Sequence, residues 1–353
     1  MTSLEPQPFA LRPASRTALW VSVLLFLAMA IGGLFQVKWA PYYAKSFFAA
    51  AHGTLGASIL SGKAAAPLPA GWRAGVDYSL AYLAAIWQAL LLGLALGAGV
   101  EVLLPRQWLA RLFSGGSSSL RAGAFAIPSM MCTCCAAPIA VGLIESETGP
   151  AAALVYWLAN PVLNPATLVF IGFVLGWQWT ALRLVIGLPL VFALGHAAAR
   201  LVPADLPLSP PPAPAEPIGN VLIAWMRRFL RLTVRLVPEY LVLVFALGAL
   251  RAWLFPEMTP TIGHAPWLVP ALAASGTLFV IPTAGEVPII QVLQHFGLAS
   301  AAAAALLITL PAVSLPSLAI LGRVLPMRVV VALGLGTFIF GLIAAGLAAA
   351  LGL

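Results

Sequence analysis

Residues 126–143 read AIPSMMCTCCAAPIAVGL, and residues 280–293 read VIPTAGEVPIIQVL. Both stretches are apolar, and in both an Ile-Pro pair is followed by a Pro-Ile pair. Proline cannot donate a backbone hydrogen bond, so two prolines this close together interrupt a helix that contains them. Each stretch therefore predicts a place where the chain turns within apolar surroundings.

The composition of the whole chain indicates what those surroundings are. Of its 353 residues, 62% are apolar and 8% are charged, and the mean hydropathy is +1.02. Soluble domains carry about 25% charged residues, and several runs here are long enough for a bilayer core of about 30 Å. We predict a multi-pass α-helical protein of the cytoplasmic membrane. The net charge of +8 fits basic cytoplasmic loops better than a nucleic-acid partner.

The two opening stretches belong to a longer duplication. The tetrapeptide ALGA occurs at Ala95–Ala98 and again at Ala246–Ala249, 151 residues later, and Pro161 corresponds to Pro311 at an offset of 150. Together with the Ile-Pro and Pro-Ile pairs, these matches keep one order and nearly one offset. Internal duplication of this kind is a feature of secondary transporters.

The duplication predicts the organisation of the chain. We expect an N-terminal transmembrane helix and interfacial segment, a first transmembrane repeat, a proline-rich cytoplasmic linker, and a second repeat preceded by an amphipathic helix. The corresponding residues are 1–76, 77–201, 202–222 and 223–353. Within the first segment we expect one uncleaved span over residues 18–35. After it, the aromatic cluster of Trp39, Tyr42, Tyr43, Phe47 and Phe48 is typical of a helix at the membrane interface.

The distribution of Lys and Arg predicts the topology. If residues 122–147 and 266–297 are re-entrant hairpins, twelve of the eighteen basic residues lie inside and six outside. If both segments span fully, the division is nine and nine. The positive-inside rule favours the first arrangement, in which the two repeats are inverted. We therefore predict an all-α helical bundle of two inverted repeats, each with a re-entrant or broken-helix hairpin, and keep nine full spans as the alternative. The basic residues at 227, 228, 231 and 235 have helical spacing and are expected against anionic headgroups.

All three cysteines of the chain lie within four positions, as Cys132, Cys134 and Cys135. Thiols are soft ligands that favour copper(I), zinc and other thiophilic species. We interpret the cluster as a C-x-C-C set that offers two or three sulfurs to a substrate or metal, and not as a thioredoxin-like redox pair. The alternative is that the small cysteines only pack in the core.

Other polar residues occur at matched breaks in the two repeats. Glu286 is the acidic residue expected deepest in the membrane, where carboxylates usually mark an ion or proton pathway; we predict that it carries the coupling ion, with a structural Glu as the alternative. Asn160 and Asn164 flank a helix break and are expected to line a binding site, although they could instead cap the broken halves. We also count the hydroxyl groups at these turns as candidate binding groups, namely those of Thr133, Thr283 and Ser314.

Four of these motifs carry a resemblance to a known family. CTCCAAPIAVGL followed by WLANPVLNPATLVF, and IPTAGEVPIIQVL followed by LITLPAVSLPSLAIL, resemble the bacterial predicted-permease family that includes ArsP. The resemblance covers roughly residues 77–350. It implies an efflux permease that exports trivalent organoarsenicals and handles them through cysteine thiols, here Cys132, Cys134 and Cys135.

The sequence thus predicts a secondary transporter, and not an enzyme, with no cofactor. Its partners would be the lipid bilayer and a small-molecule or metalloid solute, most of all a trivalent organoarsenical, and a homo-oligomer is left open. Two alternatives remain: a permease or channel for a metal ion or sulfur compound, and a membrane thiol-redox enzyme. No phosphate-binding glycine loop occurs in the sequence, so energy from ATP would have to come from another subunit.

Overall fold

The computed structural model describes residues 16–60, 68–146, 148–203 and 218–353; most of the predicted proline-rich linker lies outside them. Throughout this described part, the regular secondary structure is helical. Seven helical segments are long and apolar enough to cross a membrane, which confirms the predicted class. They are Leu19–His52, Trp72–Val102, Pro150–Val174, Trp177–Ala199, Val221–Leu254, Ser300–Leu321 and Met327–Leu351.

The predicted first repeat contains eight α-helices and a π-helical turn. They are α3 (Trp72–Val102), α4 (Arg106–Leu112), α5 (Ser118–Ser129), α6 (Thr133–Glu145), α7 (Pro150–Val162), α8 (Pro165–Val174), α9 (Trp177–Pro189), η2 (Leu190–Leu194) and α10 (Gly195–Ala199). The second repeat follows the same scheme. Its helices are α11 (Ile218–Leu254), α12 (Pro260–Gly263), α13 (Leu268–Leu278), α14 (Glu286–His295), α15 (Ser300–Ala312), α16 (Leu315–Leu321) and α17 (Met327–Leu351).

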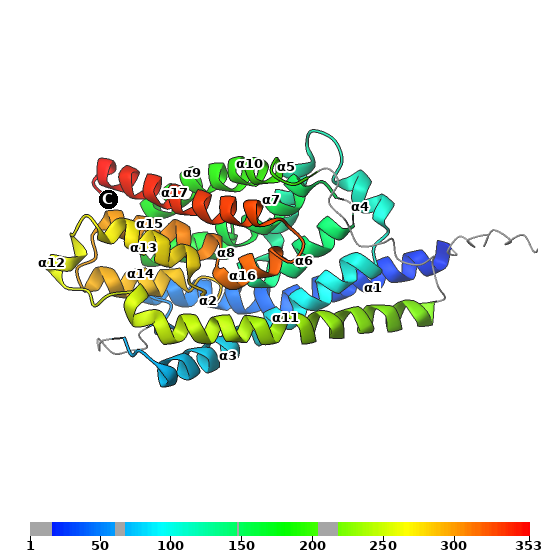
Figure 1. Cartoon of the computed structure of the whole chain (residues 1–353), viewed down its shortest axis with the longest axis horizontal. Coiled ribbons are helices and arrows are strands. Elements are labelled where there is room, and N and C mark those ends of the chain that lie inside the picture. Colours follow the sequence, from blue (N-terminus) through cyan, green and yellow to red (C-terminus); the bar gives the residue numbers. More distant parts are fainter. Residues whose placement is uncertain (1–15, 61–67, 147, 204–217) are drawn as a thin grey trace, which may run out of the picture.

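The long helices lie along the long axis of the molecule (Figure 1). The short helices of the two repeats gather at different ends: α4 and α5 lie at the right of the view, and α12, α13 and α14 lie at the left. Helix α3 of the first repeat packs along α11 of the second, and α6 and α7 join the same core. Inversion of the repeats stays a prediction, with which this separation of the short helices agrees.

Both predicted hairpins consist of two short helices. At 1.5 Å per residue, helices of 12 and 13 residues in α5–α6 and of 11 and 10 residues in α13–α14 are about 15–20 Å long. A bilayer core is about 30 Å thick, so none of the four crosses it alone. Helix length therefore favours broken-helix hairpins over two additional full spans.

The tips of the two hairpins share an unusual backbone geometry. Met130, with φ = 47°, and Ala284, with φ = 65°, are the non-glycine residues with positive φ in the described chain. They are 154 residues apart, the same offset that relates the two Ile-Pro pairs. A left-handed conformation costs a residue with a side chain about 1–2 kcal/mol, and such strain is usually kept where function requires the geometry.

The N-terminal segment differs from the expectation of a separate interfacial helix. Helix α1 (Arg16–Leu34) continues through the π-helical turn η1 (Phe35–Trp39) into α2 (Ala40–His52) without a break. The aromatic cluster therefore lies on the extension of the first span. The π-helical turn contains Lys38, whose side chain is 4% exposed and points into the bundle.

Basic residues of α11 also do more than face headgroups. Arg228 forms ion pairs with Glu101 of α3 at 2.5 Å and with Glu145 of α6 at 2.7 Å. The expectation that Arg228 belongs to a headgroup-facing stripe is therefore wrong, because its charge is used between helices. These pairs tie the second repeat to the C-terminal end of α6, whose other end carries the cysteines.

Candidate functional site

The tips of the two hairpins meet inside the bundle and enclose two cavities. The larger, of about 300 Å³, is lined by Cys132 from the first tip, by Thr283 from the second, and by Lys38 of the first span. The smaller has room for about one water molecule and is lined by Cys132, Thr133, Thr283 and Glu286. Residues 150 positions apart in the sequence thus contribute to one site.

Carbonyl groups at the tips and at the adjoining helix ends are paired with side-chain donors. Buried backbone groups need partners, above all in a membrane, where water cannot supply them. Aromatic residues from the surrounding helices donate these hydrogen bonds: Trp39 to the carbonyl of Pro128 at 2.7 Å, Trp157 to that of Thr133 at 2.9 Å, Tyr78 to that of Val280 at 2.5 Å, and Tyr82 to that of Ile281 at 3.4 Å. The tips are therefore held in fixed positions.

The three cysteines begin α6 and fall on two sides of it. Cys132 is the N-cap residue, and its Sγ lies 2.6 Å from the Sγ of Cys135, one helical turn later; all three cysteines are free. The Sγ of Cys134 instead lies 3.4 Å from the Oγ of Ser314 at the start of α16. The Oγ1 of Thr133 is also 3.4 Å from the same Ser314 hydroxyl. Cys132 and Cys135 therefore form the close thiol pair, and Cys132 opens onto the cavity.

Two expectations about the cysteines need correction. Cys132 and Cys135 are separated by two residues, so the cluster does contain a C-x-x-C spacing, which the C-x-C-C interpretation overlooked. The interpretation of Cys132, Cys134 and Cys135 as one three-sulfur metal site narrows to the pair of Cys132 and Cys135: among the described residues, no three His, Cys, Asp or Glu side chains are placed to hold a metal ion. The physical reason is that neighbouring residues on a helix point in different directions, whereas residues three apart face the same way.

Close packing of α3 against α6 fixes the cysteine turn. Gly93 of α3 lies so near that a Cβ atom in its place would be 2.2 Å from the carbonyl oxygen of Cys135. Small residues let membrane helices approach in this way. The position of the thiol pair thus depends on the absence of a side chain at Gly93.

The two asparagines at the α7–α8 break hold the backbone. Asn160 accepts a hydrogen bond from the backbone N–H of Met131 at 3.3 Å, and its Nδ2 donates to the carbonyl of Tyr156 at 2.9 Å. Asn164 is the N-cap of α8 and accepts from the N–H groups of Ala166 and Thr167. Asn160 therefore supports the first tip directly, and the capping alternative describes what the side chain of Asn164 does.

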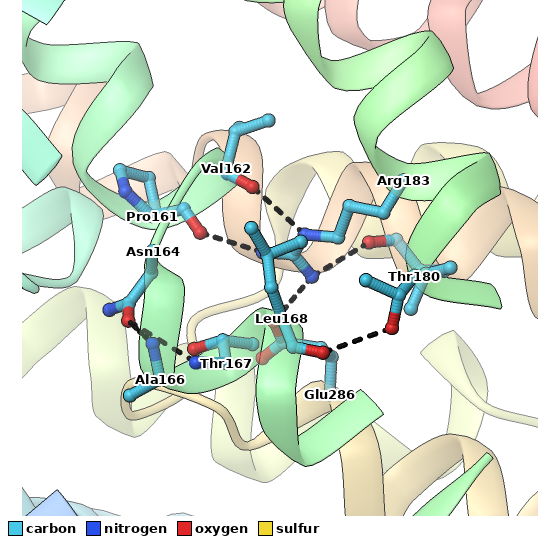
Figure 2. A network of polar contacts seen from close by, with 10 residues as sticks. Pro161, Val162, Asn164, Ala166, Thr167, Leu168, Thr180, Arg183 and Glu286 are labelled. Carbon is cyan, nitrogen blue, oxygen red and sulfur yellow. Dashed lines mark hydrogen bonds and ion pairs between the residues drawn. The ribbon is translucent and has the colours of Figure 1, made fainter. Parts of the chain in front are cut away.

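Glu286 begins α14 and forms a fully buried ion pair with Arg183 of α9. The distance from Nη1 to Oε1 is 2.7 Å, and the side chains are 0% and 1% exposed. Figure 2 shows the guanidinium group between this carboxylate and the carbonyl oxygens of Pro161 and Val162, to which it donates at 2.6 and 3.0 Å. A further bond goes to the carbonyl of Leu307 at 3.3 Å. The other carboxylate oxygen of Glu286, Oε2, is buried without a hydrogen-bond partner in the described structure.

Arg183 completes the end of α7 as well as the ion pair. The last carbonyl groups of a helix have no partner within it, and a cation near them is favourable because the helix dipole is negative there. Arg183 supplies both hydrogen bonds and charge to Pro161 and Val162, at the break of α7. It thereby connects the break in the first repeat with Glu286 and Leu307 of the second.

Sequence reasoning missed Lys38 and Arg183, which the topology count assigned to the outside. Lys38 donates to Thr283 Oγ1 at 3.0 Å and to the Tyr42 hydroxyl at 3.3 Å. Arg183 is the one Lys, Arg, Asp or Glu in the apolar segment Trp177–Ala199, and Lys38 shares the segment Leu19–His52 only with Lys45. Such isolated charges in apolar helices indicate buried functional or paired groups. The same signal led to the prediction for Glu286, so it could have identified the two basic residues.

Comparisons with known proteins agree with the resemblance seen in the sequence. The model of the family described as "Predicted permease" matches residues 72–350. The UPF0718 protein YraQ of Escherichia coli strain K12 is 42% identical over 334 residues, which cover 93% of this chain and 95% of YraQ. No solved structure matches the chain. The chain is therefore a multi-pass membrane protein that belongs to the predicted-permease family.

Proposed function

We propose that the protein is a secondary transporter of the cytoplasmic membrane that exports a thiophilic solute, specifically a trivalent organoarsenical. The observation that carries the proposal is the thiol pair of Cys132 and Cys135 beside a cavity between the two hairpins. A volume of about 300 Å³ is at the lower end of the range for small-molecule sites. It suits a methyl or phenyl arsenical.

Two thiols one helical turn apart can bind trivalent arsenic reversibly. An organoarsenical of the form R–As(OH)₂ reacts with the thiols of Cys132 and Cys135 to give R–As(S–Cys)₂ and two molecules of water. Two As–O and two S–H bonds break, two As–S and two O–H bonds form, and no electron is transferred. Release is the reverse reaction with water. Soft thiolates favour such a centre over hard oxygen ligands.

The remaining predicted residues surround this pair in defined roles. Asn160 holds the first tip through Met131, and Ser314 and Thr133 lie beside Cys134. Thr283 lines both cavities. The hydroxyl groups of Thr133 and Thr283, which line the cavities, would contact the oxygen ligands of the solute before the thiols displace those ligands.

Glu286 would couple transport to protons through its pair with Arg183. Protonation of the carboxylate removes the charge that Arg183 balances, and so weakens a contact between the two repeats. Two packed halves that change their relative position are the usual basis of alternating access. The free Oε2 of Glu286, at the small cavity, is where the proton would bind.

The test is export of phenylarsenite and methylarsenite, measured as uptake into everted membrane vesicles of cells that lack other arsenical exporters. Cys132→Ser and Cys135→Ser should each lower uptake to background, because serine keeps the volume and removes the soft ligand. Cys134→Ser, which alters a sulfur outside the pair, is the matched control and should retain most of the activity. Cys132→Ala separates packing from chemistry: it should behave like Cys132→Ser. If the variant that lacks all three cysteines takes up the arsenicals at the wild-type rate, the proposal is refuted. A pentavalent arsenical should give no cysteine-dependent uptake.

A further inference from the structure

The larger cavity is positively charged. Lys38 lies in its wall and Lys45 at its mouth, seven residues later on the same helix, with Tyr42 between them. No acidic side chain belongs to its lining among the described residues. In that same part of the chain, neither lysine forms an ion pair with a carboxylate. Glu286 directly follows the lining residue Gly285 in the sequence, but its carboxylate is paired with Arg183.

Lys38 is held in place for this role. Its side chain is 4% exposed, and its ammonium group donates to Thr283 Oγ1 and to the Tyr42 hydroxyl. Neither hydrogen-bond partner is a carboxylate, so the charge of Lys38 acts on the Cys132 thiol and on any group bound in the same cavity. An ammonium group has three N–H donors, so one donor remains for a bound group. A buried charge without a counter-charge is costly, and an anionic ligand would remove that cost.

The N-terminus of α6 adds to the same potential. This helix of 13 residues begins at Thr133, with Cys132 as its N-cap, and no side chain caps its first turn. The unpaired N–H groups at a helix start carry a partial positive charge of about half an elementary charge. The positive end of α6 and the ammonium group of Lys38 therefore act on the same place, the cavity at the Cys132 thiol.

We infer that the preferred solute is an anion that also carries a soft atom: an arsenical with an acidic group, whose arsenic binds the thiol pair while its acidic group faces Lys38 and Lys45. The binding of arsenic in this inference rests on the proposed function, and the preference for an anion rests on the charge of the cavity. It also gives a role to the N-terminal span, because Lys38 and Lys45 lie outside residues 72–350 that the family model matches.

The charge of the cavity can be tested without any arsenical. In the purified full-length variant Cys134→Ser/Cys135→Ser, Cys132 is the remaining thiol. Its modification rate is measured with two methanethiosulfonate reagents of similar size, one carrying a sulfonate and one a trimethylammonium group, and each rate is divided by the rate of the same reagent with a small free thiol. One-sign cavities raise the encounter rates of opposite charges by about 10–1,000-fold, so the sulfonate should react at least about tenfold faster. Lys38→Gln should bring the ratio of the rates close to one, whereas Lys38→Arg should preserve it.

Two further variants keep this test decisive. Lys45→Gln changes an exposed position of the cavity lining and should lower the ratio in part. Arg111→Gln removes an equal charge at an exposed position of α4 and should leave the ratio unchanged. Three results in the Cys134→Ser/Cys135→Ser variant that retains Lys38 would overturn the inference. They are equal rates for the two reagents, a faster reaction of the cationic reagent, and no modification of Cys132 at all.

Transport then separates this inference from the proposed function. Uptake of 4-carboxyphenylarsenite and of neutral phenylarsenite is compared in everted vesicles. Lys38→Gln should reduce uptake of the carboxylated compound at least about tenfold more than uptake of the neutral one. If uptake depends on the cysteines but Lys38→Gln lowers it equally for both compounds, the inference is refuted and the proposed function stands. A sulfonate preference at Cys132 without uptake of any arsenical would refute the proposed function and leave the anion site standing.

Discussion

Removing the charge of Glu286 should destabilise the protein through Arg183. In Glu286→Gln the amide oxygen can still accept a hydrogen bond from Nη1, but the guanidinium group keeps a buried charge with no counter-ion. Breaking a buried ion pair by removing one partner costs about 3–5 kcal/mol. We expect a loss of about 3 kcal/mol in the free energy of unfolding, at the lower end because the hydrogen bond persists. Unfolding by SDS in mixed micelles measures this loss.

Arg183→Met should cost more, because it also removes the donors to the backbone. The carbonyl groups of Pro161, Val162 and Leu307 each lose a hydrogen bond. A buried polar group left without its partner costs about 1–3 kcal/mol. Together with an unpaired carboxylate, the loss should therefore exceed that in Glu286→Gln by several kcal/mol.

The double variant Arg183→Met/Glu286→Gln isolates the ion pair. Each single variant leaves one buried charge without a counter-ion, whereas the double variant leaves none. The double variant should therefore be about 3 kcal/mol more stable than the sum of the two single losses implies. Additive losses, with a coupling energy below about 0.5 kcal/mol, would refute the reasoning.

In proteoliposomes, Glu286→Gln should also lose uptake driven by a pH gradient while it still binds the arsenical. Wild-type gradient-driven uptake would reduce Glu286 to a structural role.

Three other features give shorter tests. Gly93→Ala should lower the thermal midpoint and uptake together, because its Cβ would meet the carbonyl of Cys135, whereas Gly346→Ala, with no neighbour within 4 Å, should not lower the midpoint. Asn164→Ala should cost about 1 kcal/mol of stability through loss of the α8 cap while Asn164→Ser keeps it; equal stability of the two variants would contradict the capping role. Gly116→Cys should resist an impermeant maleimide in intact cells in a cysteine-free background while Thr261→Cys reacts, and the opposite result would reject the predicted orientation.

Much of the fold could be predicted because membrane helices leave strong signals in the sequence. The apolar runs, the matched prolines and the repeated ALGA motif indicated the spans and the two short-helix hairpins. The tips could be placed near Cys132 and Thr283 because proline and the loss of helix periodicity mark a break wherever it occurs. The continuous helix through Trp39 was not predicted, because aromatic residues suit both an interface and a helix that packs within the bundle.

The candidate site could be predicted in its parts but not in its pairings. The chemical character of the cysteines and of Glu286 is local, so the sequence reveals it. Which thiols face each other depends on the start of α6, and the partner of Glu286 lies 103 residues away on α9. Such long-range contacts follow from packing, which a single sequence does not state. Lys38 and Arg183 were therefore counted among the six basic residues on the outside, although their side chains are buried.

The most direct test of the account is a count of thiols in the purified protein during titration with phenylarsenite. If Cys132 and Cys135 bind one arsenic, each bound arsenical should remove two of the three reactive thiols under denaturing readout. Cys134→Ser should still lose two, and Cys132→Ser should bind weakly and lose none at the same concentration. Loss of two thiols in Cys132→Ser at the wild-type concentration, or tight binding with all three thiols still reactive, would contradict the account.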